Sequence, residues 1–465
     1  MSNREDMALM AHLMRRAGFG ANKGELERLV GEGYEATVEE LIDPPDDRPG
    51  GNTALLLRYH PIALMPGATT NPGQFNWIYH MLSTQRPLHE KMALFWHQVF
   101  ATGNSKIDNG DKMMEQLVML RSHGVGNYKD MLIELSKNPA MIFWLDNNEN
   151  HRDAVNENWG RELLELFSMG VGNYTEVDVR EASRAFTGWT ILPTLPRSPF
   201  GRYPWQYEFR EEDHDDTEKT FLGHTGNFSG EDIIEIIVRQ PATARFICRH
   251  LYNFFVADEV QVPAWTIEPA RDEAALEIMM NAFTESGYEM KAVLRAIFNS
   301  DFFKDARFSK IKSPVDVVLN TLKMVGAFQF PEPNLAGVAP ETGYMGQALL
   351  DPPSVEGWNT GVEWINSGSL LARINFVADK VTDTSLPGIK SIISQMQADG
   401  VSTPEQLVEA TLDHMGYLQV GGETRQQLLD YAMGEGNLDW SGQSAGSRVA
   451  EMLALVGATT EFQFG

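Results

Sequence analysis

Apolar residues recur at helical spacing along most of the chain. The clearest stretch begins near residue 86, where Pro87 suits the first turn of a helix and Leu88, Met92 and Phe95 form an apolar stripe. The same periodicity predicts further helices within residues 7–41, 111–121, 128–136, 231–256, 272–285, 290–299, 315–325 and 403–464. The pattern therefore predicts a mainly α fold, with a C-terminal helical subregion over residues 380–465.

Two segments depart from the helical pattern. From Tyr203 to Phe209, aromatic residues alternate with other residues, which is the period of a strand. We expect a small β-hairpin or irregular insert over residues 190–230. Residues 331–369 are rich in proline and glycine, and we expect a long loop-rich segment there. A connection of that length inside a compact protein is usually functional.

The segment from Asn156 to Trp189 reads as a helical hairpin with a glycine turn near residue 170. Asp153 or Asn156 is the expected cap of the first helix. Thr175 and Asp178 have the spacing of a capping box for the second helix.

Charged residues of this hairpin stand four positions apart, so that each set shares one helix face. The two sets are Glu157, Arg161 and Glu165, and Glu176, Arg180 and Arg184. An exposed ladder of such pairs contributes only about 0.3 kcal/mol per pair. Alternatively, guanidinium groups and carboxylates beside Trp159 and Trp189 are typical of a ligand cleft. The residues leave both interpretations open.

The composition narrows the function classes. The 465 residues carry a formal net charge of -26, which disfavours nucleic acid as a partner. The single cysteine, Cys248, permits no intramolecular disulfide and fits a reducing compartment. No stretch approaches the roughly twenty apolar residues that span a bilayer, and the first residues do not resemble a signal peptide. We therefore expect a cytoplasmic protein without a membrane span.

Histidines and carboxylates suggest two further kinds of site. His97 lies among aromatic residues and is more often a packing residue than a ligand. His214 and Asp215 belong to an acidic turn that offers hard oxygen ligands and one imidazole, so a divalent metal ion is one option there. The sequence signatures of P-loop nucleotide binding, serine hydrolases and zincins are absent.

Six blocks of the chain resemble the large bacterial family known as DUF1800. They are HLMRRAGFG near the start, HEKMALFWHQVF at 89–100, the hairpin at 156–189, HDDTEKTFLG at 214–223, SPVDVV at 313–318 and DPPSVEGWNTGVEWINSGSLLARINF at 351–376. The resemblance implies one mainly helical unit over residues 1–465. It also implies a protein partner, since members are often encoded beside a sulfatase-like family, DUF1501.

The chain departs from the family pattern in two ways. Members are often exported, whereas no export signal is visible here. Val99 stands where members often have a second histidine, which weakens a metal site built on His97.

The candidate site residues come from the hairpin and the matched blocks. The expected catalytic groups are Glu157, Glu162, Glu165, His214 and His97. The expected substrate-binding groups are Asn156, Arg161, Arg180, Arg184, Trp189, Lys219, Trp358 and Arg373. One hypothesis is a hydrolase-like enzyme with a cleft lined by Glu, Arg and His. The alternative is a non-enzymatic binding or assembly subunit that acts with a DUF1501-like partner. A shared concave pocket would favour a site, and scatter would favour a surface ladder.

Overall fold

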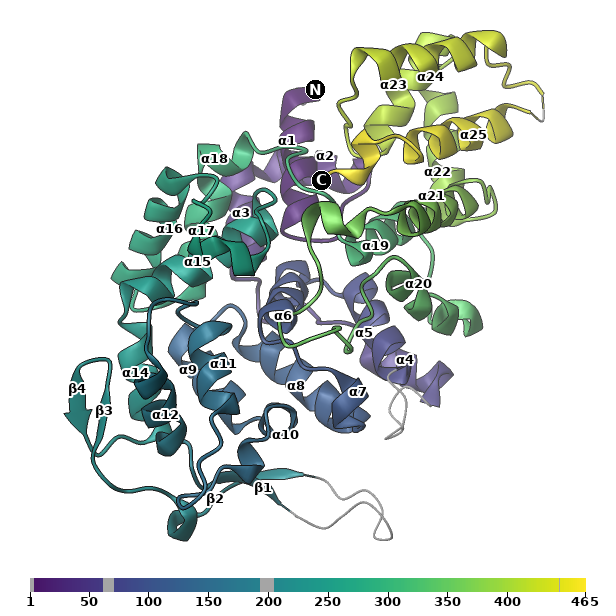
Figure 1. Cartoon of the computed structure of the whole chain (residues 1–465). Coiled ribbons are helices and arrows are strands. Elements are labelled where there is room, and N and C mark those ends of the chain that lie inside the picture. Colours follow the sequence, from purple (N-terminus) through teal and green to yellow (C-terminus); the bar gives the residue numbers. More distant parts are fainter. Residues whose placement is uncertain (1–3, 62–70, 193–204, 443) are drawn as a thin grey trace.

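A computed structural model describes residues 4–61, 71–192, 205–442 and 444–465. The described chain is mainly helical, as the periodicity predicts (Figure 1). Its first helices are α1 (Arg4–Arg16), α2 (Lys23–Glu32), α3 (Tyr34–Ile42), α4 (Thr53–Tyr59), α5 (Asn71–Ser83), α6 (Pro87–Val99), α7 (Asn104–Ile107), α8 (Gly110–His123), α9 (Tyr128–Lys137), α10 (Pro139–Trp144), η2 (Asn147–Glu149), α11 (Asn158–Glu165) and α12 (Glu176–Ala185).

The helices that follow the β segments complete the fold. They are η3 (Glu211–Asp213), α14 (Gly230–Val238), α15 (Pro241–Phe255), η4 (Val262–Thr266), α16 (Glu273–Glu285), α17 (Met290–Asn299), α18 (Asp301–Lys304), α19 (Pro314–Met324), η5 (Pro333–Gly337), α20 (Ala339–Tyr344), η6 (Gly361–Trp364), α21 (Ser367–Val381), α22 (Pro387–Ala398), α23 (Pro404–His414), α24 (Gly422–Gly434), α25 (Ala445–Gly457) and η7 (Glu461–Gln463).

The β insert consists of two small antiparallel hairpins. Strand β1 (Trp189–Leu192) pairs with β2 (Gln206–Phe209), and β3 (Lys219–Phe221) pairs with β4 (His224–Gly226). The predicted insert is therefore confirmed, with the difference that two hairpins are present. Tyr203, the first residue of the alternating pattern, lies outside the described residues.

Helix α6 lies between two hydrophobic cores. Met92, Phe95 and Trp96 pack into the core that α9, α11, α15 and α17 share, whereas Ala93 and Leu94 pack into the core of α5, α19, α21 and α25. A helix that is buried on all sides needs apolar residues on more than one face. Helix α6 has buried apolar residues on several faces. The proposal of one helical unit over the whole chain stays a prediction.

The charged hairpin forms as expected, except at its first cap. The capping box of Thr175 and Asp178 is present at the start of α12. The expectation that Asp153 or Asn156 caps α11 is wrong, because Glu157 occupies the cap position and no side chain bonds there. Asn156 instead accepts a hydrogen bond of 3.0 Å from the main-chain nitrogen of Asn158, which shapes the turn before the helix.

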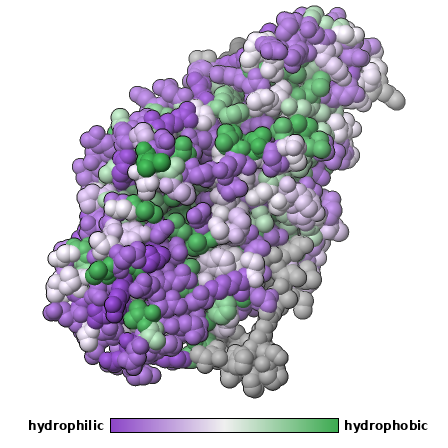
Figure 2. Space-filling view, in the orientation of Figure 1, coloured by the Kyte–Doolittle hydropathy of each residue, from purple (hydrophilic) through white to green (hydrophobic). Residues whose placement is uncertain are grey.

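The segment 331–369 is loop-rich, yet it also contains the short helices η5, α20 and η6. The face of the molecule seen in Figure 2 is largely hydrophilic, with hydrophobic patches between the polar residues. Within the described ranges, no helix has the length and hydropathy needed to cross a membrane.

Candidate functional site

Two adjoining cavities, which share several lining residues, form one cleft. Their volumes are about 280 and 350 Å³, which suits a small organic ligand. Both cavities are lined by Val99, His250, Val262, Pro263 and Glu356. The walls come from the end of α6, the turn after α11, helix α15, η4 and the loop that precedes η6.

The loop before η6 is held against α6 by a close main-chain approach. A side chain at Gly357, where φ is +93°, would meet the carbonyl oxygen of Gln98 at 2.4 Å, so only glycine fits. The Gln98 amide then donates a 2.7 Å hydrogen bond to the carbonyl of Trp358. This anchoring places the neighbouring Glu356 at the edge of the cleft.

The turn after α11 also depends on a glycine. Gly170 has a φ of +78°, and a side chain there would lie 2.8 Å from a ring carbon of Phe246 on α15. The close contact sets the distance between α11 and α15, and thus the width of the cleft on this side.

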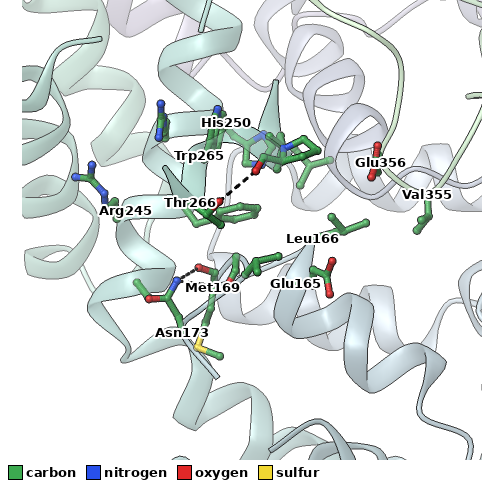
Figure 3. Close-up of a pocket in the computed structure, with 18 residues that line it drawn as sticks. Glu165, Leu166, Met169, Asn173, Arg245, His250, Trp265, Thr266, Val355 and Glu356 are labelled. Atoms are coloured by element: carbon green, nitrogen blue, oxygen red, sulfur yellow. Dashed lines mark hydrogen bonds between the residues drawn. The ribbon is translucent and has the colours of Figure 1, made fainter. Parts of the chain in front are cut away.

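The wall opposite the carboxylates is aromatic. The ring of His250 lies 4.6 Å from that of Trp265 and 4.6 Å from that of Phe246. The guanidinium of Arg249 lies 4.6 Å from the centre of the Trp265 ring and donates a 2.9 Å hydrogen bond to Glu259. In Figure 3, His250 and Trp265 lie on one side of the pocket and Glu165 and Glu356 on the other.

His250 presents a neutral imidazole to the cleft. Burial, with a smaller effect of the Arg249 charge, lowers the pKa of His250 to about 3. Its buried Nε2 makes no hydrogen bond to any described residue. This nitrogen is out of reach of a ligand in the cleft, so the His250 ring contributes to the wall as an aromatic surface.

Two carboxyl groups, Glu165 and Glu356, line the other side of the cleft, and Glu162 lies beside them. Glu162 and Glu165 stand one turn apart on α11, and Glu356 approaches from the loop. The hydroxyl of Tyr174 donates a 2.8 Å hydrogen bond to Glu165. Burial, together with the negative charges of Glu165 and Glu356, raises the pKa of Glu162 to about 7. A carboxyl group of this kind can both donate and accept a proton near neutral pH.

The segments that meet here are also those that carry the family resemblance. The model of the DUF1800 family, described as a protein of unknown function, matches residues 12–464. The chain belongs to the DUF1800 family. Neither the curated proteins nor the solved structures contain a match. In this family member, three blocks that are far apart in sequence line one cleft: the end of α6, the end of α11 and the loop before η6.

Only part of the predicted site reaches the cleft. Glu165 and Trp358 line it, and Glu162 interacts with its carboxylates. Trp358 is itself buried, and its indole nitrogen donates a 3.0 Å hydrogen bond to the carbonyl of Ala348. These three residues stay candidates for a functional role.

Glu157 and Arg161 of the first charged set form a surface ladder with Glu176 of the second set. Arg161 donates hydrogen bonds of 2.9 and 2.7 Å to Glu176, and it lies 3.5 Å from Glu157. The Glu176 side chain is 74% exposed, so solvent screens this network. Arg180 is exposed on the same helix.

Arg184, from the second charged set, holds the β insert onto α12. Arg184 donates a 2.7 Å hydrogen bond to Asp215 and another to Glu181. Burial opposes ionisation of Asp215, but hydrogen bonds from Arg184 and Thr217 outweigh it and keep the pKa of Asp215 below its usual range. Lys219 is buried and donates hydrogen bonds to the carbonyls of Asp215 and Thr217. Every polar group of this network therefore has a structural partner.

The remaining candidates lie apart from the cleft or behind it. His97 is buried between Trp77 and Trp358, at ring distances of 5.6 and 5.2 Å, and burial lowers the pKa of His97 to about 3. His214 bonds the carbonyl of Thr187 at 2.8 Å. Three further candidates have structural neighbours. Asn156 accepts the bond at the start of α11, Trp189 packs on Phe186 and Tyr207, and Arg373 donates to the carbonyl of Lys312.

No group of three or more His, Cys, Asp or Glu side chains in the described part of the chain is arranged to hold a metal ion. His214 and Asp215 thus have no third ligand of these types among the described residues. The divalent metal stays a hypothesis without a structural candidate.

Sequence reasoning missed the aromatic wall and one carboxylate. His250 has the spacing of a core residue on α15, and the sequence contains no signal that η4 would cover it with Trp265. Glu356 could have been proposed from the sequence, because it lies in the long loop-rich segment and a connection of that length is usually functional.

Proposed function

We propose that the protein is a hydrolase-like enzyme and that its chemistry takes place in the cleft between α11, α15 and the loop before η6. The observation that carries the proposal is that Glu165 and Glu356 line one wall, opposite His250 and Trp265, and that their charges reach Glu162 beside them and help to raise its pKa. A carboxyl group whose pKa is raised to near neutral, beside other carboxyl groups, is an arrangement that acid and base catalysis can use.

Glu162 is the proposed proton donor or acceptor. Among the described residues, none donates a hydrogen bond to its carboxylate, so the group is free to serve a substrate. In the protonated form Glu162 gives its proton to the leaving group, while an ionised neighbour, Glu165 or Glu356, takes a proton from the attacking water. The Tyr174 hydroxyl orients Glu165 through its 2.8 Å hydrogen bond.

The charges of the cleft favour a neutral or cationic substrate. Three carboxyl groups repel phosphate esters. The two arginines of the opposite wall are already paired, Arg245 with Glu273 at 2.7 Å and Arg249 with Glu259 at 2.9 Å. The half-buried indole of Trp265 lines the cleft and adds apolar surface that a sugar ring can contact. We therefore propose a carbohydrate-like substrate with a bond that carboxyl groups can hydrolyse.

The test is a screen of the purified protein with glycoside, ester and phosphoester substrates. We expect activity on neutral glycosides, a loss of about 100-fold in kcat for Glu162→Gln, and a loss of the pH dependence near 7. Glu277→Gln is the matched control, because Glu277 is exposed on α16. Equal activity of the wild type and Glu162→Gln would remove the assigned role.

A second proposal is an assembly role with a DUF1501-like partner in the cytoplasm. Exposed apolar residues on α20, η6 and α21 support it: Tyr344, Val362 and Leu371 are 71%, 74% and 58% exposed. The buried free thiol of Cys248 is compatible with a reducing compartment. Coexpression with such a partner should give a complex that Val362→Asp weakens, and a complex unaffected by that change would argue against this surface.

A further inference from the structure

The two cavities of the cleft differ in chemistry. The first, of about 280 Å³, is walled mainly by apolar side chains such as Leu166 and Phe246. The second, of about 350 Å³, has many amide, hydroxyl and carboxyl groups in its walls, among them Asn253, Ser354 and Asn359. The proposed proton transfers need only the edge that the cavities share, so they leave the polar lining of the second cavity without a role.

Asn253 of α15 offers an unpaired amide nitrogen to the second cavity. The residue is 8% exposed, and its Oδ1 accepts a 3.0 Å hydrogen bond from the main-chain nitrogen of Glu259, which fixes the orientation of the amide. The Nδ2 makes no hydrogen bond to a described residue, yet it is not sealed from solvent as the Nε2 of His250 is. Because Asn253 lines the second cavity and is otherwise buried, the cavity is the space that this donor reaches.

Further free polar groups stand at the edge of the same cavity. Ser354, Asn359 and Glu363 line it and are exposed. The Ser354 hydroxyl accepts a 3.2 Å hydrogen bond from the main-chain nitrogen of Glu356, which leaves its own hydrogen available. Within the described residues, the side chains of Asn359 and Glu363 make no hydrogen bond. The cavity therefore presents both donors and acceptors that a ligand can use.

The charges of the second cavity exclude an anionic ligand. Lys310 lines it, but the Lys310 ammonium is paired with Asp258 at 2.9 Å. The carboxyl groups of Glu356 and Glu363 are left without a cationic partner among the described residues. A hydroxyl group donates one hydrogen bond and accepts others, so a hydroxyl-rich ligand matches a mixture of amide donors and carboxylate acceptors.

The walls of the second cavity are joined to each other without a ligand. The Gln261 amide, just before η4, donates hydrogen bonds of 3.0 and 3.1 Å to the carbonyl and the hydroxyl of Thr360, which precedes η6. This link holds the two segments at a set distance. A pocket that is already formed costs less ordering when the ligand binds.

We propose that the second cavity is a subsite for a sugar unit, so that the substrate of the cleft is an oligosaccharide of at least two units. The inference rests on the hydrolase-like function proposed above and names the part of the substrate that the second cavity holds. Glu356 lines both cavities, so a substrate that fills both lies across its carboxyl group. One ring contacts Trp265 in the first cavity (Figure 3), and the next contacts Asn253 and the half-buried Phe254 in the second.

The experiment measures binding of the full chain to disaccharides in which sulfur replaces the bridging oxygen, because such probes bind without being hydrolysed. The panel contains thio-linked dimers of glucose, galactose and N-acetylglucosamine, with the single sugars as references. Isothermal titration calorimetry should show saturable binding of at least one dimer at one site per chain. The dimer should bind about 10-fold or more tightly than its single sugar, because the second ring adds hydrogen bonds.

Asn253→Asp tests the donor in the second cavity. The new carboxylate keeps the oxygen that accepts the bond from the Glu259 main chain, but it cannot donate a hydrogen bond to a sugar. We expect it to weaken binding of the dimer by about 10-fold. Asn437→Asp is the matched control, since Asn437 is exposed and lines neither cavity, and it should leave binding unchanged.

Asn359→Ala keeps the test decisive if Asn253→Asp does not fold. Asn359 is exposed at the edge of the second cavity, and its loss should weaken dimer binding by about 5-fold. Dimer binding that the variants weaken supports the subsite even if no glycoside is hydrolysed, in which case the proposed chemistry alone fails. Absence of saturable binding across the panel overturns the subsite, even where simple aryl glycosides are hydrolysed. Equal dimer binding by the wild type and the folded variants would overturn it as well.

Discussion

The carboxyl group of Glu162 should make the protein less stable at neutral pH than at pH 5. Burial and the charges of Glu165 and Glu356 raise the pKa of Glu162 from 4.5 to about 7 in the folded state. An acid whose pKa is higher in the folded state than in the unfolded state does not reduce the free energy of unfolding at pH values below its unfolded-state pKa. As the pH rises from the unfolded-state pKa to the folded-state pKa, the free energy of unfolding falls. The loss therefore falls between about pH 4.5 and pH 7.

The magnitude follows from the size of the pKa shift. At about 1.4 kcal/mol per pKa unit, the shift corresponds to roughly 3 kcal/mol between the two protonation states. Because the side chain is partly exposed, solvent screens the interaction, and we expect about 1 to 2 kcal/mol in practice. Glu162→Gln keeps the shape and removes the ionisation, so this variant should be more stable than the wild type by that amount at pH 8. At pH 4.5 the two proteins should have nearly equal stability.

Urea denaturation followed by tryptophan fluorescence at pH 5, 6, 7 and 8 measures the difference. Comparing the wild type with the variant at each pH cancels the titration of all other groups. Glu277→Gln, on the exposed face of α16, controls for the removal of one negative charge. A constant stability difference between pH 5 and pH 8 would refute the reasoning, because it would mean that Glu162 ionises at its ordinary pKa.

Two further changes test how the walls of the cleft are built, and a third tests the surface ladder. Gly170→Ala should cost about 1 to 3 kcal/mol in urea unfolding, because the new side chain meets an aromatic ring of α15, whereas Gly172→Ala, with a φ of +91° and open space, should cost less. Arg249→Met should destabilise by about 3 to 5 kcal/mol, because it leaves the buried Glu259 unpaired, and adding Glu259→Gln should recover part of the loss. Arg161→Ala should cost less than about 1 kcal/mol, and a larger cost would show that the surface ladder is structural.

The helical fold and most helix boundaries are readable from the sequence, because they depend on local periodicity and on turn chemistry. The capping box of Thr175 and Asp178 is an example, since both bonds join residues three positions apart. The small β insert is readable for the same reason, from the alternation that ends at Phe209. The N-terminal cap of α11 could not be predicted in this way. Asp153 and Asn156 are typical capping residues, but Glu157 occupies the cap position and its side chain makes no capping hydrogen bond.

Only part of the candidate site could be predicted from the sequence. The sequence marks Glu162 and Glu165 as charged and Trp358 as part of a long loop, but it treats all the charged residues of the hairpin alike. Their environments separate them: Glu176 is 74% exposed, while Glu162 is partly buried and faces two other carboxylates. Proton affinity depends on solvent access and on charges from distant segments, and neither is a property of local sequence.

The sequence by itself determined a mainly helical family member with a charged hairpin, a β insert and a functional-looking loop, because periodicity, capping and composition act over a few residues. The tertiary structure alone decided which of those features meet. It brought Glu356 to Glu162 and covered His250 with Trp265. Such encounters depend on how helices pack across hundreds of residues, where burial and long-range charge set the chemistry of each group.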